Sequence, residues 1–121
     1  MSVVVLALSV LPSIAQSNMN AQEQANLKFV LDWWREVIQS RHVELAPKYQ
    51  AKDYIQHNIN IQTGRAGFVK FFGGLGQPVP IAAELTNKPT VAFGKGDYVL
   101  VVWEREGKDP ALRKMVLIGH S

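Results

Sequence analysis

The longest periodic pattern of apolar side chains runs from Ala21 to Ser40. Apolar residues recur there at three- and four-residue spacing, the period of one face of a helix: Leu27, Val30, Leu31, Trp34 and Ile38. Three further apolar residues widen the stripe: Phe29, Trp33 and Val37. We therefore expect a helix that is covered on more than one side or borders a cavity. Asn20, with Glu23 three residues later, predicts a capping box at its start.

Two shorter helices are predicted in the middle of the chain. The first covers residues 42–50 and places Pro47 in its own first turn, where a missing N–H costs nothing. The second follows Thr63, whose hydroxyl is expected to cap it, and ends at Gly73 and Gly74. Three aromatic residues share one face of that helix: Phe68, Phe71 and Phe72.

The rest of the chain has the alternation of β structure. Residues 81–85 and 90–93 are extended candidates, either separate or joined in one bent strand around residues 87–89. Residues 94–97, Gly-Lys-Gly-Asp, predict a hairpin turn into the strongest strand, residues 98–105, of which both faces are expected to be largely buried. Residues 107–110 read as a loop and residues 115–118 as one last short strand. Helices followed by antiparallel strands indicate an α+β fold.

Composition limits the chemistry. A chain of 121 residues with 47% hydrophobic content is typical of one compact domain. With no cysteine, a disulfide framework, a thiolate nucleophile and a cysteine-ligated metal are all excluded. The 13 basic and 10 acidic residues are interspersed, so the formal charge of +3 forms no stripe that would favour nucleic acid. The Gly64 to Gly67 run lacks the ending of a P-loop and the glycine spacing of a dinucleotide site. No metal or cofactor is expected.

The first 22 residues contain no charged side chain. Residues 3–11 form an apolar run too short to span a bilayer and suited to a signal-peptide core, with small residues before Ala15. We expect residues 1–15 to be a signal peptide directing the chain to the periplasm or outside the cell, and no membrane insertion after its removal. The basic residue that usually begins such a signal is missing, so an N-terminal core strand or helix stays open as the alternative. Residues 16–24 then lead into one domain over residues 25–121.

One segment combines a phenol, an imidazole and a carboxamide: Asp53-Tyr54-Ile55-Gln56-His57-Asn58. Its alternation predicts a short strand or extended edge with Tyr54 and Gln56 on one face, and the Gly64-Arg65-Ala66-Gly67-Phe68 helix follows. These residues, with the hairpin at Gly96-Asp97-Tyr98-Val99, resemble the SnoaL-like polyketide-cyclase and aldol-condensation branch of the nuclear-transport-factor-2-like (NTF2-like) superfamily. The resemblance covers residues 25–108 and implies a cone in which N-terminal helices pack on a curved antiparallel sheet.

The candidate site follows from this segment and the aromatic residues. His57 could take a proton from carbon next to a carbonyl, and Tyr54 or Asn58 could hold the developing enolate oxygen. Aromatic residues are expected to line a pocket for a small apolar ligand, which His57 enters: Trp33 or Trp34, with Phe68, Phe72 and Trp103. A lone histidine beside an asparagine is also common as a hydrogen-bonded structural pair. Asp53 is read as a turn carboxylate, and Asp32 and Glu36 are expected to face solvent.

The resemblance fades after Asp109, where the family usually continues through two more strands with Phe-Asp-x-Phe-Arg and Glu-His-Trp-Asp runs. We therefore expect a cone that lacks its last strands and leaves apolar groups of residues 98–103 poorly covered, which favours a homodimer or marginal stability. Three interpretations stay open. The chain is a metal-free cyclase, isomerase or aldol-type enzyme, a non-catalytic module that binds a hydrophobic ligand or dimerises, or an inactive gene fragment.

Overall fold

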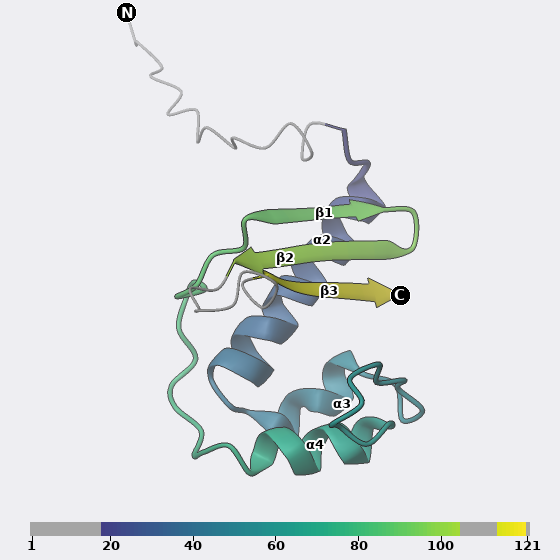
Figure 1. Cartoon of the computed structure of the whole chain (residues 1–121). Coiled ribbons are helices and arrows are strands. Elements are labelled where there is room, and N and C mark those ends of the chain that lie inside the picture. The colour runs from purple at the N-terminus through teal and green to yellow at the C-terminus, as the bar shows by residue number, and fades with distance from the viewer. Residues whose placement is uncertain (1–17, 105–113, 121) are drawn as a thin grey trace, which may run out of the picture.

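The computed structural model describes residues 18–104 and 114–120. One long helix forms the spine of the molecule (Figure 1), with a three-stranded antiparallel sheet packed against its N-terminal half and short helices around its C-terminal end. The predicted α+β class is confirmed. The predicted signal peptide, residues 1–15, and the loop at residues 107–110 lie outside the described residues. Within the described residues, no helix is long and apolar enough to cross a membrane.

The spine begins as α-helix α2, Ala21–Trp33, and continues as π-helix η1, Trp34–Gln39. The predicted capping box is confirmed: the Glu23 N–H donates to Asn20 Oδ1 at 2.8 Å, and the Asn20 N–H donates to Glu23 Oε1 at 3.0 Å. Glu23 Oε2 also accepts the Gly96 N–H at 2.6 Å, so the capping carboxylate joins the start of the helix to the β-hairpin. The π-helix, in which hydrogen bonds close over one more residue per turn, was not predicted.

The short helices surround the end of η1. Residues 42–50 form the 3-10 helix η2, Val43–Leu45, and then α3, Ala46–Tyr49, with Pro47 in the first turn of α3 as predicted. The helix after Thr63 is α4, Arg65–Gly73, and it ends at Gly73 and Gly74 as predicted. The predicted Thr63 cap is wrong. Gly64 is the N-cap at φ 90°, and the Thr63 hydroxyl contacts Tyr54 O and the Gln56 N–H instead.

The sheet has the order β1-β2-β3, with β1 Val91–Lys95, β2 Tyr98–Glu104 and β3 Lys114–His120. The predicted hairpin is confirmed: Lys95 pairs with Tyr98 across a two-residue turn in which Gly96 has φ 56°. The expected last strand is present as β3, which pairs along all of β2, from Tyr98 opposite His120 to Glu104 opposite Lys114. β1 and β3 are the edges of the sheet among the described strands.

Three strand predictions need correction. Residues 54–57 and 81–85 form no strand, and β1 is therefore not part of a longer bent strand. The 54–57 backbone bonds instead to the turn before α4, and the 81–85 carbonyls are held by side chains of the spine. The faces of β2 are also unequal. Val99, Val101 and Trp103 are buried, whereas Tyr98 on the other face is 56% exposed. The expectation that the apolar groups of residues 98–103 are poorly covered is therefore wrong for the inner face.

The core consists of two clusters that meet along the spine. The sheet cluster joins the start of α2 to the inner face of β2 through these buried residues: Met19, Leu27, Val99, Val101 and Trp103. The helical cluster lies at the other end and contains Trp33, Val37, Ala46 and Phe68. Val30 and Trp34 pack against both clusters. The two parts of the fold are thus connected by side chains of a single helix.

Candidate ligand-binding site

The five aromatic residues expected at the site form one continuous series, which we call the aromatic row. Its rings touch in the order Trp103, Trp34, Trp33, Phe68 and Phe72. Trp34 stacks on Trp103 with ring centroids 4.2 Å apart, and the Phe68 and Phe72 centroids are 4.5 Å apart. Trp33 and Trp34 are neighbours on the spine, with centroids 6.0 Å apart, and the 5.8 Å contact between Trp33 and Phe68 joins the spine to α4. The row therefore runs from the sheet cluster into the helical cluster, at distances typical of packed aromatic pairs. The rings were expected to line a pocket that His57 enters, but they pack on one another, and His57 is exposed.

Two buried side chains near the row have polar atoms without hydrogen-bond partners. They are the indole Nε1 of Trp33 and both amide atoms of Gln50. Gln50 comes one turn after Ala46, which packs in the same helical cluster as Trp33. Interior polar groups are nearly always satisfied by protein, water or a ligand, and an unsatisfied one costs about 1–3 kcal/mol. Two donors and one acceptor, all uncharged, are thus available in the interior of the helical part of the fold.

Tyr54 joins this region from the loop before α4. Its ring lies edge-on to Phe68 with centroids 6.0 Å apart, and burial raises the pKa of its phenol. No hydrogen bond of this hydroxyl to another described residue is present, so the neutral phenol can donate to an acceptor placed beside it. Tyr54 is the one member of the predicted catalytic set whose side chain reaches the row.

His57 and Asn58 lie elsewhere, on the loop between Tyr54 and Gly64. The loop closes on itself because the Gly64 N–H donates to Tyr54 O at 2.6 Å and the Gln56 N–H donates to Thr63 Oγ1 at 3.1 Å. Its middle therefore projects outward, and both side chains are exposed. Asn58 Oδ1 accepts the Asn60 N–H at 3.0 Å, which organises the turn. The His57 ring has no hydrogen bond or ion pair with another described residue.

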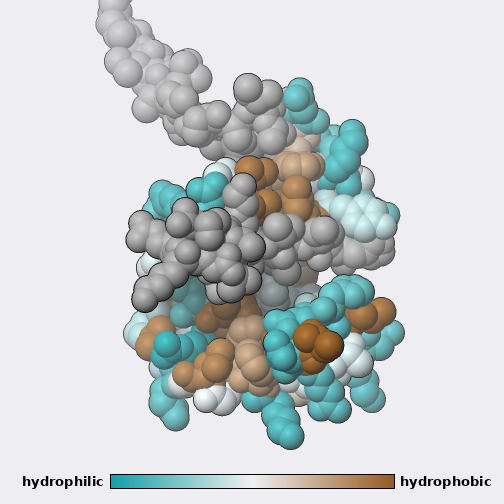
Figure 2. All heavy atoms as spheres, in the orientation of Figure 1, coloured by the Kyte–Doolittle hydropathy of each residue, from teal (hydrophilic) through white to brown (hydrophobic). Residues whose placement is uncertain are grey.

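Aliphatic side chains are also exposed on this loop. Ile59, at its tip, is 97% exposed, and Ile55 is exposed as well. Figure 2 shows hydrophobic side chains at several places on the helical part of the surface, between hydrophilic ones.

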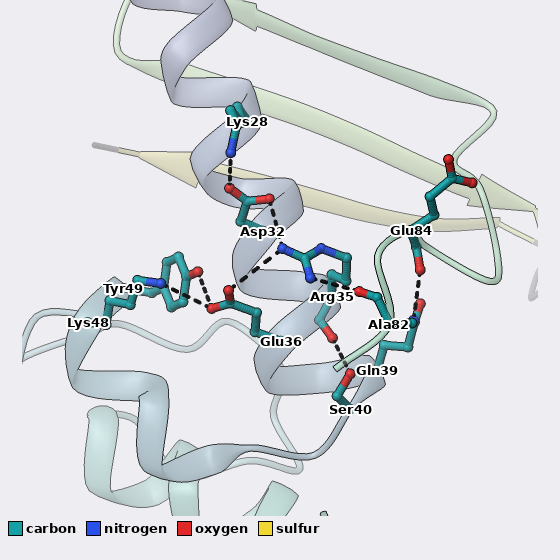
Figure 3. Close-up of polar contacts among 10 residues, drawn as sticks. All are labelled: Lys28, Asp32, Arg35, Glu36, Gln39, Ser40, Lys48, Tyr49, Ala82 and Glu84. Atoms are coloured by element: carbon teal, nitrogen blue, oxygen red, sulfur yellow. Dashed lines mark hydrogen bonds and ion pairs between the residues drawn. The ribbon is translucent and has the colours of Figure 1, made fainter. Parts of the chain in front are cut away.

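A polar cluster occupies the outer face of the spine (Figure 3). Asp32 accepts from Lys28 and from Arg35, and Glu36 accepts from the Tyr49 hydroxyl and from Lys48 at 3.3 Å. The expectation that Asp32 and Glu36 face solvent is therefore wrong, and their side chains are only 28% and 14% exposed. The hydrogen bond from Tyr49 lowers the pKa of Glu36. Burial alone would raise the pKa of Asp32, but the hydrogen bonds from Lys28 and Arg35 outweigh burial, and the net result is a lowered pKa. Every carboxylate of this cluster is compensated, which makes the cluster structural.

An open pocket of about 490 Å³ lies beside α4 and is lined by Lys52, Gly64, Arg65, Ala66, Val69 and Lys70. It shares no residue with the aromatic row, and the Arg65 guanidinium is already bonded to Gln50 O at 3.0 Å. The described residues contain no group of three or more histidine or acidic side chains that could hold a metal ion.

Sequence reasoning found the rings of the row but missed Gln50, which carries no pattern that distinguishes it from a surface amide. Comparison of the chain with protein-family models, with curated proteins and with solved structures found no match.

Proposed function

We propose that this chain is a SnoaL-like, NTF2-like module that binds a small, uncharged apolar carbonyl compound against the aromatic row. The observation that carries the proposal is the set of buried, unpaired atoms on Trp33 and Gln50. The indole and amide N–H groups suit a carbonyl oxygen, and the amide oxygen suits a hydroxyl. An apolar wall with a few convergent polar groups is the usual composition of a small-molecule site.

The sequence of elements supports the NTF2-like cone as the framework of this proposal. Helices come first, an antiparallel sheet follows, and Trp34 and Trp103 link the two. In such a framework the ligand would lie at the helical end of the spine, where the rings of Trp33, Phe68 and Tyr54 meet. The three-stranded sheet leaves two edges among the described strands, and pairing of one edge with a second copy would give the expected homodimer.

The proposal is tested by comparing two probes that differ in one polar group, 2-acetylnaphthalene and naphthalene, by quenching of tryptophan fluorescence. The wild type should prefer the ketone about tenfold, since one hydrogen bond to a buried, otherwise unpaired donor is worth about 1–3 kcal/mol. Trp33→Phe keeps an aromatic ring but removes the N–H, so it should abolish the preference and leave naphthalene binding nearly unchanged. Equal binding of the two probes by the wild type would contradict the proposal.

Two variants serve as controls. Trp103→Phe removes an indole N–H that already donates to Asn87 O at 3.0 Å, so it should lower stability and keep the ketone preference. Gln50→Leu removes the unpaired amide, and it should weaken ketone binding while raising the free energy of unfolding of the empty protein by about 1–3 kcal/mol.

The catalytic hypothesis, a metal-free acid–base enzyme of SnoaL type, is the second candidate. It is favoured by Tyr54, a half-buried neutral phenol next to Phe68 that can stabilise an enolate oxygen. The exposed position of His57 means that the base would have to come from a rearranged loop. The test is the rate at which the acetyl protons of 2-acetylnaphthalene exchange with D2O, followed by NMR. If the wild type accelerates this exchange and both Tyr54→Phe and His57→Gln lose the acceleration, the chain is an enzyme. If the wild type does not accelerate the exchange, the catalytic hypothesis is wrong and the binding module remains.

A further inference from the structure

The segment between α4 and β1, residues 76–90, has no helix or strand, and we call it the strap. It lies along the spine and is held by side chains that bond to its backbone. Arg35 donates to Ala82 O at 2.8 Å, Gln39 donates to Glu84 O at 3.1 Å, and Trp103 donates to Asn87 O. Figure 3 shows the first two of these contacts. Arginine, glutamine and tryptophan keep their donors at any physiological pH.

The contact nearest the start of the strap is different because it uses a histidine. His42 Nε2 lies 2.6 Å from Val79 O, and His42 Nδ1 lies 2.6 Å from a carboxylate oxygen of Glu44. A carbonyl and an ionised carboxylate can only accept. A neutral imidazole has a single N–H, so only the doubly protonated ring can satisfy both contacts.

The surroundings of the ring favour that charged form. The hydrogen bond to Glu44 raises the pKa of His42 above its ordinary value, the Val79 carbonyl raises it further, and Glu36 on η1 adds a weaker attraction. Residues 76–83 of the strap contribute no charged side chain. Two cations lie in the elements around the His42 ring. The Arg41 guanidinium lies against Gly76, and Lys70 belongs to α4, a helix that packs on η2.

We propose that His42 is a pH-sensitive clasp that ties the start of the strap to η2. The charged ring holds Glu44 and Val79 O together. Loss of one proton leaves one of these oxygens facing a ring lone pair. The anionic Glu44 carboxylate is the stronger acceptor and keeps the remaining N–H, so the contact with Val79 O is released.

The direction of the effect follows from the raised pKa. The clasp is complete below the ordinary histidine pKa and is lost as the pH rises through the raised pKa of the folded protein. The Val79 N–H donates to Ser40 O at 3.0 Å, so the clasp sits over the end of η1, where Ser40 is buried. Ile38 and Phe72 of the helical cluster are close to this point in the chain and are only partly buried. Release would therefore open the helical cluster at one edge and leave the sheet cluster closed.

NMR titration of the full chain tests the proposal. The His42 ring nitrogens should show a charged ring with a midpoint above about 6.5, and the amides of Val79 and Ile81 should shift with the same midpoint. The amide of Thr86, which is held by Gln39 Oε1 at 2.9 Å, should not shift with it. Glu44→Gln should lower both midpoints together, His42→Gln should abolish the amide titration, and His57→Gln should leave it unchanged.

Two results would overturn the clasp: Val79 and Ile81 amides that stay constant while the His42 ring titrates, or an amide titration that persists in His42→Gln. Because the wild-type titration alone can give the first result, the test does not depend on whether a variant folds.

Discussion

Replacement of Phe68 by alanine tests whether the helical cluster is a packed core. The Phe68 ring is 1% exposed and contacts three other rings, those of Trp33, Phe72 and Tyr54. Truncation of a fully buried phenylalanine costs about 3–5 kcal/mol, because the lost transfer free energy adds to the cost of the cavity. Small domains have about 5–15 kcal/mol of stability in total, so this single change removes a large share of it.

The matched control is Phe71→Ala, on the same helix but with a side chain that is 39% exposed. Its removal should cost only about 1–2 kcal/mol, since part of its area is already in water. Urea unfolding followed by tryptophan fluorescence measures both, because Trp33 lies 5.8 Å from the Phe68 ring and reports on the cluster. If the two variants lose equal stability, or if Phe68→Ala loses under about 1.5 kcal/mol, the helical cluster is not packed as described.

Two further predictions concern the junction of helix and hairpin. The backbone N–H groups of Asn20 and Gly96 lower the pKa of Glu23. The ionised carboxylate therefore stabilises the fold above its ordinary pKa of 4.5, and this stabilisation is lost as the pH falls through the lowered pKa of the folded protein. Over that pH range the free energy of unfolding should depend less on pH in Glu23→Gln than in the wild type. Gly94→Ala should destabilise the protein by about 1–3 kcal/mol, because a Cβ there would lie 2.6 Å from the Glu23 carbonyl oxygen. The control is Gly73→Ala, which should change stability little, since its Cβ would meet Val43 Cγ2 at an ordinary 3.6 Å. Thermal melts measure both variants.

Local patterns in the sequence predicted the local structure well. The capping box at Asn20, the accommodation of Pro47 and the turn at Gly96 each depend on residues within a few positions of one another. The sequence also indicated which rings lie together, because large rings at helical spacing are usually buried, but it predicted a pocket where the rings pack on one another.

The errors arose where distant residues decide the outcome. Residues 81–85 have the composition of a strand, but Arg35 and Gln39 take up their carbonyls and no neighbouring strand does. Asp32 and Glu36 have the spacing of solvent-facing charges, and only the fold brings Tyr49 and Lys48 to Glu36. The outward direction of His57 depends on the closure of its loop by Tyr54 and Gly64, which no single-segment pattern records.

The sharing of Val30 and Trp34 between the two clusters has a consequence for how the molecule melts. Neither cluster can lose its packing without withdrawing support from the same turn of the spine, where α2 passes into η1. If the sheet or the helical end unfolded alone, these two side chains would lose about half of their contacts. An intermediate with only one part ordered would therefore have a raised free energy. We therefore expect the sheet and the helical end to unfold together, in a single transition shared by all probes, although they look like separable parts.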